Sequence, residues 1–324
     1  MAQIPRDLLL ALDYGGTKHS AALLGRDART WLAHARVSSP PGADASHDQA
    51  TMLRMAHGLL AQNRGRLAAV GVSFGGPVDA AHGLVKLSYH IPGWNEMPLR
   101  DLLQAEFGVP AMVDNDANAA ALAEWRRGAG QGCNSLLYVT VSTGIGGGWV
   151  LGGRIYGGAD GMAGEIGHTL VQPDGLTCPC GKRGCLEAEA CGRGIAQHAR
   201  QRLAAAPESG AIVRALAGGD LSAVTAQMIA QAAQAGDQLA GEVLDQAART
   251  LGIGLGNAIN LMNPQRVVLG GGVTKSGERY WALLREAARA QALPLLSVDI
   301  VPAALGDDAP LWGAAALAES LLPR

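Results

Sequence analysis

Two strand–turn–strand units with glycine-rich turns constrain the fold of this chain more than any other feature of its sequence. In the first, apolar runs at 7–13 and 19–24 predict strands on either side of Tyr14-Gly15-Gly16-Thr17. In the second, predicted strands at 135–141 and 149–151 flank a glycine turn at 142–148. A dinucleotide-binding unit continues from its glycine turn into a helix, so this pattern argues against a Rossmann fold. Because both turns combine Thr with paired glycines, we interpret them as an internal duplication, with two ordinary hairpins as the alternative.

The rest of the chain alternates between predicted helices and predicted strands. Helical patterns cover 48–62, 99–107, 118–127, 239–262 and 310–321. Short apolar runs predict strands at 68–74, 110–113, 266–269 and 298–302. Gly252-x-Gly254-x-Gly256 lies within a predicted helix, where close packing against a neighbour explains glycine better than phosphate binding does.

Composition and charge exclude several classes of protein. The chain has 324 residues, of which 48% are hydrophobic and 17% charged, and its net charge is −2. A packed globular core is therefore expected, and nothing indicates a nucleic-acid or membrane partner. The N-terminal sequence lacks the pattern of a secretion signal, and no segment reaches the roughly 18 apolar residues that span a bilayer. The five cysteines, four of them between 178 and 191, fit a reduced compartment, so we expect a soluble cytoplasmic protein.

The two glycine turns have the chemistry of phosphate-binding loops. Without side chains at the tip, backbone N–H groups approach phosphate oxygens, and Thr adds a hydroxyl donor. Asp13, directly before the first turn, could hold Mg²⁺ through water. Neither turn is a Walker A motif, and a tight hairpin remains the alternative for each.

Three consecutive polar residues, Asp114, Asn115 and Asp116, follow an apolar strand and precede a helix. Asp and Asn are good helix caps, which explains one of them. An Asp beside an Asn at this position could also accept a proton from a hydroxyl group while the amide orients the molecule that carries it.

A cluster of metal-ligating residues lies between 165 and 187. His168, Cys178, Cys180 and Cys185 provide four ligands separated by turn formers, which suits tetrahedral Zn²⁺ in a structural role. Glu165 and Glu187 stand at its two ends, which suggests that the metal organises another site. Cys133 and Cys191 match no ligand spacing and are interpreted as ordinary small residues.

Taken together, these motifs resemble those of the ROK family of repressors, open reading frames and sugar kinases, notably its bacterial glucokinases. The matching segments are Asp13-Tyr14-Gly15-Gly16-Thr17-Lys18, Gly76-Pro77-Val78-Asp79, Pro92-Gly93-Trp94, Asn115-Asp116-Ala117-Asn118, Thr143-Gly144-Ile145-Gly146-Gly147-Gly148, Ala163-Gly164-Glu165-Ile166-Gly167-His168, Cys178 to Ala188 and Gly270-Gly271-Gly272-Val273. They cover nearly the whole chain in order.

The resemblance implies an α/β, two-domain, actin- and hexokinase-like fold of duplicated ribonuclease H-like units around an active-site cleft. The expected domains are 1–119 with 308–324, and 120–307. Asp116 then corresponds to the catalytic base. The implied sugar-binding residues are Gly76, His90, Asn115, Asp116, Glu165, His168 and Glu187. The implied ATP and Mg²⁺ residues are Asp13, Gly15, Gly16, Thr17, Lys18, Thr143, Gly144, Gly146, Gly147, Gly271 and Gly272. The implied zinc ligands are His168, Cys178, Cys180 and Cys185.

The expected reaction is ATP-dependent phosphorylation of the 6-hydroxyl of a hexose, with glucose first. An N-acetylmannosamine or N-acetylglucosamine kinase, or a fructokinase, remains an alternative, because His90 stands where family kinases often carry a sugar-contacting Asn. A sugar-responsive transcriptional regulator is a more remote alternative, since no helix-turn-helix segment or basic patch fits ahead of Asp13. ATP or polyphosphate as donor stays open, and a homo-oligomer, dimer or tetramer, is expected by analogy.

Overall fold

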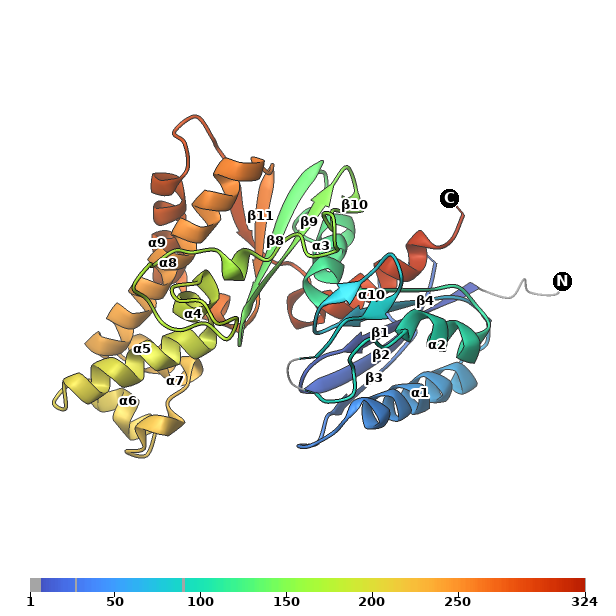
Figure 1. The fold of residues 1–324 in the computed structure, drawn as a ribbon, viewed down its shortest axis with the longest axis horizontal. Coiled ribbons are helices and arrows are strands. Elements are labelled where there is room, and N and C mark those ends of the chain that lie inside the picture. The colour runs from blue at the N-terminus through green and yellow to red at the C-terminus, as the bar shows by residue number, and fades with distance from the viewer. Residues whose placement is uncertain (1–6, 27, 89–90, 324) are drawn as a thin grey trace. The chain divides into compact units, whose positions relative to one another are not determined.

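The computed structural model describes residues 7–26, 28–88 and 91–323, which fall into two compact units (Figure 1). The first contains Met1–Asn134, Gly148–Ala163 and Ala304–Arg324, and the second contains Ser135–Gly147 and Gly164–Ala303. The expected division at 119–120 would cut helix α3 (Asp116–Arg127), which instead lies whole in the first unit. There α3 packs so closely on α10 (Ala309–Ser320) that a Cβ on Gly313 would lie 2.2 Å from the Ala119 carbonyl carbon.

The first unit is built on a five-stranded sheet of order β3-β2-β1-β4-β7. Its strands are β1 (Asp7–Tyr14), β2 (Lys18–Gly25), β3 (Ala33–Ser38), β4 (Arg66–Phe74) and β7 (Ala111–Asn115). Strands β1, β2 and β3 pair antiparallel, whereas β1, β4 and β7 pair parallel. This arrangement confirms the predicted strand–turn–strand at the first glycine turn.

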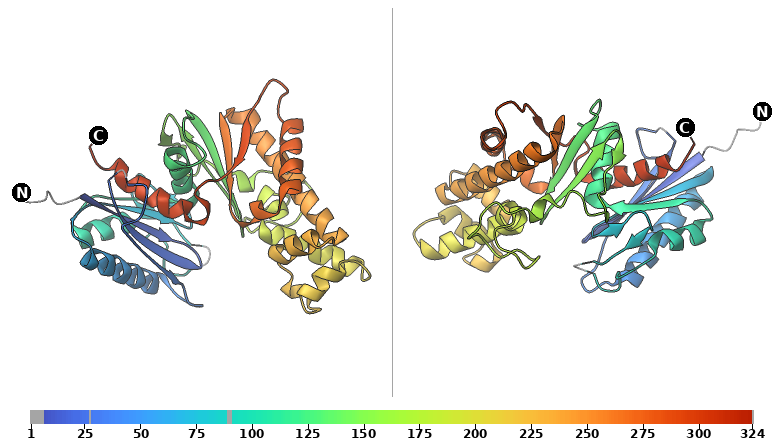
Figure 2. Two further views of the ribbon diagram at one scale, coloured as in Figure 1. Left: turned by 180° about the vertical axis from the view of Figure 1, so that it is seen from behind. Right: turned by 45° about the horizontal axis from the view of Figure 1, so that its top comes forward.

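Helices cover both faces of this sheet (Figures 1 and 2). Leu10 and Leu12 of β1 belong to a core shared with α1 (Ala45–Gln62) and α2 (Leu99–Phe107). Leu9 and Ala11 lie in a second core, on α10. Since both faces are buried, β1 reads as a continuous apolar run and does not alternate with polar residues.

The second sheet has the order β10-β9-β8-β11-β12. Its strands are β8 (Ser135–Val141), β9 (Ile145–Leu151), β10 (Arg154–Ile155), β11 (Arg266–Gly270) and β12 (Asp299–Pro302). We number the five strands of each sheet by their order in the sequence. Across both sheets the strands then lie in the order third, second, first, fourth, fifth, and the first, fourth and fifth strands run parallel. The shared order supports the internal duplication inferred from the two glycine turns.

The second unit is rich in helices. They are α4 (Leu186–Ala190), α5 (Gly192–Ala205), α6 (Ala211–Leu216), α7 (Ala226–Gln234), α8 (Gln238–Met262) and α9 (Glu278–Gln291). The glycines of α8 confirm the predicted close packing: a Cβ on Gly252 would lie 2.4 Å from the Leu284 carbonyl oxygen of α9, and one on Gly254 would lie 2.5 Å from Leu186 of α4.

Shorter elements complete the fold: β5 (Val78–Asp79), β6 (Leu84–Val85), and 3₁₀ turns at Ile166–His168, Leu221–Ala223, Gly272–Lys275 and Gly306–Asp308. Strand β3 was not predicted, because it is an exposed edge strand without an apolar run. Among the described helices, none has both the length and the hydrophobicity that a membrane span requires.

Candidate active site and metal centre

Polar side chains of the first unit gather at one edge of its sheet. The carboxyl ends of β1, β4 and β7 lie there, and the register places Asp13 beside Ser73 and Ser73 beside Asp114. The Ser73 hydroxyl donates to Asp13 Oδ1 at 3.0 Å. Asp116 follows directly, at the start of α3. Parallel strands thus bring together two acidic positions that are a hundred residues apart in sequence.

Asp13 is a strongly perturbed carboxyl group. It is only 7% exposed, and burial raises its pKa to about 7, against the opposing hydrogen bond from Ser73; the nearby Asp116 carboxylate raises the pKa further. Lys18 and Arg36 lower the pKa, but burial outweighs them. A buried acid near neutral pKa gains most from a nearby cation, which fits the magnesium-binding role expected of Asp13.

The first glycine turn is a tight hairpin with an exposed tip. The Gly15 N–H donates to the Lys18 carbonyl at 3.1 Å, and a Cβ on Gly15 would lie 2.8 Å from that oxygen. Gly16 and Thr17 are exposed. The hairpin geometry explains Gly15 by itself, whereas the phosphate-binding role of this turn stays a prediction.

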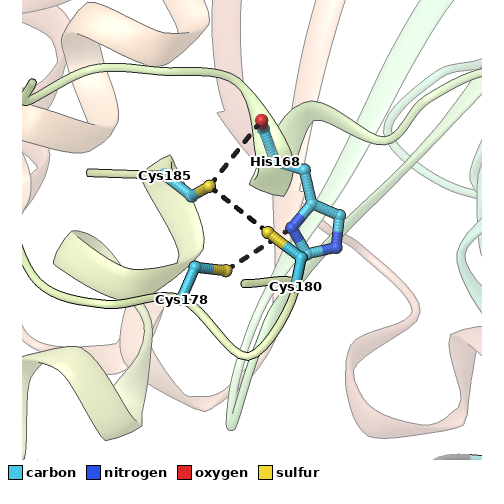
Figure 3. A group of neighbouring side chains, drawn as sticks. All are labelled: His168, Cys178, Cys180 and Cys185. Atoms are coloured by element: carbon cyan, nitrogen blue, oxygen red, sulfur yellow. Dashed lines mark hydrogen bonds between the residues drawn. The ribbon is translucent and has the colours of Figure 1, made fainter. Parts of the chain in front are cut away.

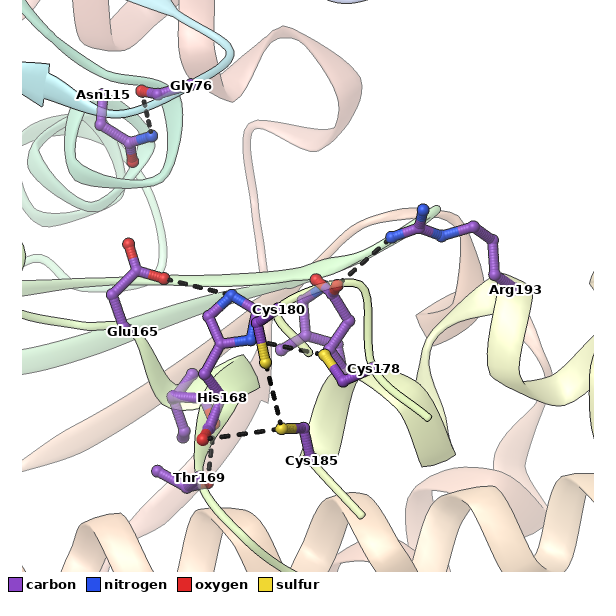
Figure 4. A network of polar contacts seen from close by, with 12 residues as sticks. Gly76, Asn115, Glu165, His168, Thr169, Cys178, Cys180, Cys185 and Arg193 are labelled. Carbon is purple, nitrogen blue, oxygen red and sulfur yellow. Dashed lines mark hydrogen bonds and ion pairs between the residues drawn. The ribbon is translucent and has the colours of Figure 1, made fainter. Parts of the chain in front are cut away.

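Asn115 is both a helix cap and a fixed amide donor. Its Oδ1 accepts from the N–H groups of Ala117 and Asn118 at 2.9 and 3.4 Å, and its Nδ2 donates to the Gly76 carbonyl at 3.0 Å (Figure 4). The second amide hydrogen is the one that a sugar oxygen could accept. The cap interpretation therefore explains Asn115 and leaves its predicted sugar contact chemically open.

The two acidic neighbours of Asn115 differ sharply in solvent exposure. Asp114 is 6% exposed and accepts from Asn118 Nδ2 at 2.9 Å, and burial raises the pKa of its carboxyl group. Asp116 is half-buried, and its Oδ1 accepts from the Ala117 N–H at 2.8 Å. Of the two acids, Asp116 is the one that can reach a hydroxyl group of a bound molecule.

The four predicted metal ligands converge in the second unit (Figure 3). One ligand atom from each of His168, Cys178, Cys180 and Cys185 lies within 4.8 Å of all the others. Cys178 Sγ is 3.6 Å from His168 Nδ1, and Cys180 Sγ is 3.7 Å from Cys185 Sγ. Tetrahedral zinc with Zn–S near 2.3 Å and Zn–N near 2.0 Å separates its ligands by about 3.6 to 3.8 Å. The donor set and its spacing therefore fit a closed structural zinc site.

His168 points its other ring nitrogen away from the cysteines. Nε2 lies 3.8 Å from Glu165 Oε2, and the Glu165 side chain is 49% exposed (Figure 4). Partial burial raises the pKa of Glu165, opposed by His168 and assisted by Glu187. With Nδ1 on a metal, Nε2 would carry hydrogen and act as a donor, as the sugar-binding prediction requires.

Glu187 contacts the second glycine turn, a relationship that sequence reasoning missed. Its Oε2 accepts from the Ile145 N–H at 2.9 Å, and its Oε1 lies 3.2 Å from Arg193 Nη2. Arg193 was not among the predicted site residues, although it stands only six positions after Glu187. No sequence pattern marks it, because its role depends on how α4 and α5 meet the turn.

A cavity of about 1030 Å³ in the second unit joins the second glycine turn to the segment after β11. Thr143, Arg193, Gly272 and Lys275 are among its lining residues. Gly271 has φ +91°, and a Cβ there would lie 2.3 Å from the Val141 carbonyl oxygen, so only glycine fits. Gly147 likewise lies where a Cβ would be 2.6 Å from the Gly164 carbonyl oxygen. Its neighbour Gly146 is half-buried.

The remaining predictions have separate outcomes. His90 lies outside the described residues. Cys133 and Cys191 are buried, 8% and 1% exposed, which confirms them as core residues; Cys191 Sγ also accepts from Gly194 N–H at the start of α5.

Comparisons with known proteins agree on one family. The model described as the ROK family matches residues 9–320. A glucokinase from Halalkalibacterium halodurans is 38% identical over 260 residues, 79% of this chain and 78% of that protein. An N-acetylmannosamine kinase from Shigella flexneri is 34% identical over 311 residues, 96% of this chain and 98% of that protein. The crystal structure of a ROK family glucokinase from Streptomyces griseus with glucose and AMPPNP has a TM-score of 0.82 at 34% identity, covering 97% of this chain and 99% of that one.

Proposed function

Because this chain belongs to the ROK family, we propose that it is an ATP-dependent hexose kinase that phosphorylates the 6-hydroxyl group, with glucose as the preferred sugar. The observation that carries this proposal is the pair of unlike carboxyl groups at the edge of the first sheet. Asp13 is buried with a raised pKa, whereas Asp116 is half-buried at a helix start. One suits a cation-bound phosphate group and the other suits a reacting hydroxyl.

Asp116 takes the role of general base. It accepts the proton of the 6-hydroxyl as that oxygen attacks the terminal phosphorus of ATP, while the bond from that phosphorus to the β-phosphate oxygen breaks and ADP leaves. Asn115, fixed by its cap and by the Gly76 carbonyl, orients the sugar through its second amide hydrogen. Phosphoryl transfer requires mainly positioning and charge stabilisation, so one base and fixed donors suffice.

The nucleotide takes the cavity of the second unit, where Thr143 and Gly272 lie on its lining. Its volume of about 1030 Å³ is ample for a nucleoside triphosphate. Magnesium is the expected counter-ion of the phosphates, and Asp13 is the acid proposed to hold it through water.

Zinc takes the Cys₃His group and serves as a scaffold. These four side chains would fill all four positions of a tetrahedral ion, so none would remain for chemistry. Bound zinc would fix His168, whose Nε2 lies 3.8 Å from Glu165 Oε2, so that both groups would be held in place for sugar hydroxyls.

A coupled assay of ADP release tests the proposal directly. Purified protein is offered Mg-ATP with glucose, mannose, fructose, N-acetylglucosamine or N-acetylmannosamine. In a parallel series polyphosphate replaces ATP, and the sugar phosphate is measured instead, because polyphosphate releases no ADP. The expected result is sugar-dependent ADP release with the highest kcat/KM for glucose. ADP release that no hexose increases would overturn the kinase assignment, and a preference for N-acetylmannosamine would replace glucose with the substrate of the Shigella relative.

A further inference from the structure

Three hydrogen bonds join the second glycine turn to the short stretch 187–193, which runs from α4 into the start of α5. The Gly192 N–H donates to the Ser142 carbonyl at 2.7 Å, and Arg193 Nε donates to the Thr143 carbonyl at 3.1 Å. In the opposite direction, the Ile145 N–H donates to Glu187 Oε2 at 2.9 Å. The conformation of the turn is therefore fixed largely by residues 187–193.

Glu187 and Arg193 form the centre of this contact, and Arg193 is labelled in Figure 4. Arg193 Nη2 lies 3.2 Å from Glu187 Oε1, and the Glu187 side chain is only 13% exposed. A Cβ on Gly144 would lie 2.5 Å from Glu187 Oε2. Glycine at 144 thus leaves room for the Glu187 carboxylate against the turn, whether or not a phosphate binds there.

The same stretch is continuous with the metal loop, by which we mean residues 168–185. Cys185, a metal ligand, directly precedes α4, and Glu187 lies in the first turn of that helix. The Leu186 N–H donates to the Thr169 carbonyl at 2.9 Å. Buried Glu189 accepts from the Leu176 N–H at 2.5 Å and lies 2.7 Å from His198 Nε2 of α5. These contacts, on either side of Glu187 in sequence, tie its helix to the metal loop.

From these contacts we propose that Arg193 is a positioning residue that, together with Glu187, couples the metal loop to the nucleotide-binding turn. Metal occupancy then controls nucleotide affinity as well as sugar affinity, through the chain Cys185, Glu187 and Ile145. The proposal deepens the kinase assignment and rests on it for the identity of the nucleotide.

The guanidinium group is suited to this task in a way that an ammonium group is not. Its planar fork lets Nε reach the Thr143 carbonyl while Nη2 reaches Glu187, and a lysine has a single nitrogen for both acceptors. An exposed ion pair without a positioning role would contribute little to the stability of the fold, and its loss would leave nucleotide binding unchanged.

Calorimetric titration with Mg-ADP, without sugar, tests the coupling on metal-loaded protein. We expect Arg193→Gln to weaken ADP binding about tenfold, as for the loss of charge-assisted hydrogen bonds, and Arg193→Lys to recover part of that loss. The matched control is Arg202→Gln on the same helix, whose guanidinium pairs with Glu242; it should stay within twofold of the wild type. In kinetic assays, Arg193→Gln should raise KM for ATP more than KM for the sugar.

Removal of the metal is the second test of the coupling, again by titration with Mg-ADP. Chelator-treated protein that keeps its circular dichroism spectrum should bind Mg-ADP several-fold more weakly, and added zinc should restore the affinity. Equal ADP affinity for wild type and Arg193→Gln would overturn the coupling, whatever the metal does. The coupling and the proposed function can fail separately. If ADP binding weakens as expected on Arg193→Gln substitution and on metal removal, but the wild type phosphorylates no sugar, the coupling is supported and the proposed function is refuted.

Discussion

His19 Nε2 lies 2.8 Å from Asp48 Oδ1 in the interior of the first unit, and both side chains are 1% exposed. Asp48 also accepts from Ser39 Oγ and from Trp94 Nε1, each at 3.3 Å. One buried carboxylate of α1 thus holds the strand after the first glycine turn and the Trp of the Pro-Gly-Trp segment.

Replacing Asp48 with Ala should lower the free energy of unfolding by about 3 kcal/mol, because a buried polar network loses its shared acceptor. Denaturant unfolding measures this change. Asp101→Ala is the control, since the Asp101 side chain is 60% exposed and pairs with its neighbour Arg100. A loss below about 1 kcal/mol for Asp48→Ala would show that the network does not stabilise the unit.

Asp116→Asn should reduce kcat by about 10²- to 10⁴-fold, the usual contribution of a general base, while sugar binding changes little. The amide keeps the size of the side chain and an acceptor for the Ala117 N–H, so the start of α3 is preserved. Steady-state kinetics and sugar titration separate the two effects. Asp299→Asn, at a side chain 73% exposed on β12, should retain full turnover. Near-normal turnover in the Asp116 variant would rule out its role as base.

Local sequence identified the residues of the candidate site better than it identified their partners. His168 and the three cysteines were predicted as one group from spacing alone, and they converge as expected. Their ligand chemistry is local, since a turn of fewer than twenty residues brings all four together. The position of Asp116 between a strand and a helix could also be predicted, because an apolar run marks the strand and a helical pattern marks the helix.

Relationships between distant elements could not be predicted in this way. Glu187 was expected at a sugar, and its contact with the Ile145 N–H depends on the position of α4 beside the second turn. Arg193 and Asp48 carry no motif, and each matters only through contacts made by the folded chain. Exposed strand β3 was missed for a related reason: pairing with β2, and not an apolar pattern of its own, makes it a strand.

The Asp13 carboxyl group should make the folded state less stable as pH rises, whereas an ion-paired acid makes it more stable as pH rises. Its pKa is raised from 3.8 to about 7 by burial, so the folded state binds a proton that the unfolded state releases. Its contribution is fully present below pH 4 and is lost as pH rises towards 7. Without added magnesium, the wild type should lose about 3 kcal/mol relative to Asp13→Asn between pH 5 and pH 8. Parallel stability curves for the two proteins would contradict the raised pKa.

The metal centre makes a final prediction about its cysteines. Metal analysis should find one zinc ion per chain, and Cys185→Ser should lose it, because a serine hydroxyl replaces the thiolate. The variant should have a lower melting temperature and weaker sugar binding together, since the metal loop begins at His168, whose Nε2 lies beside Glu165. Cys133→Ala, at a buried cysteine outside the ligand group, should keep its zinc whatever it costs in packing. Zinc-free Cys185→Ser protein with unchanged sugar affinity would show that the metal does not position the sugar-binding residues.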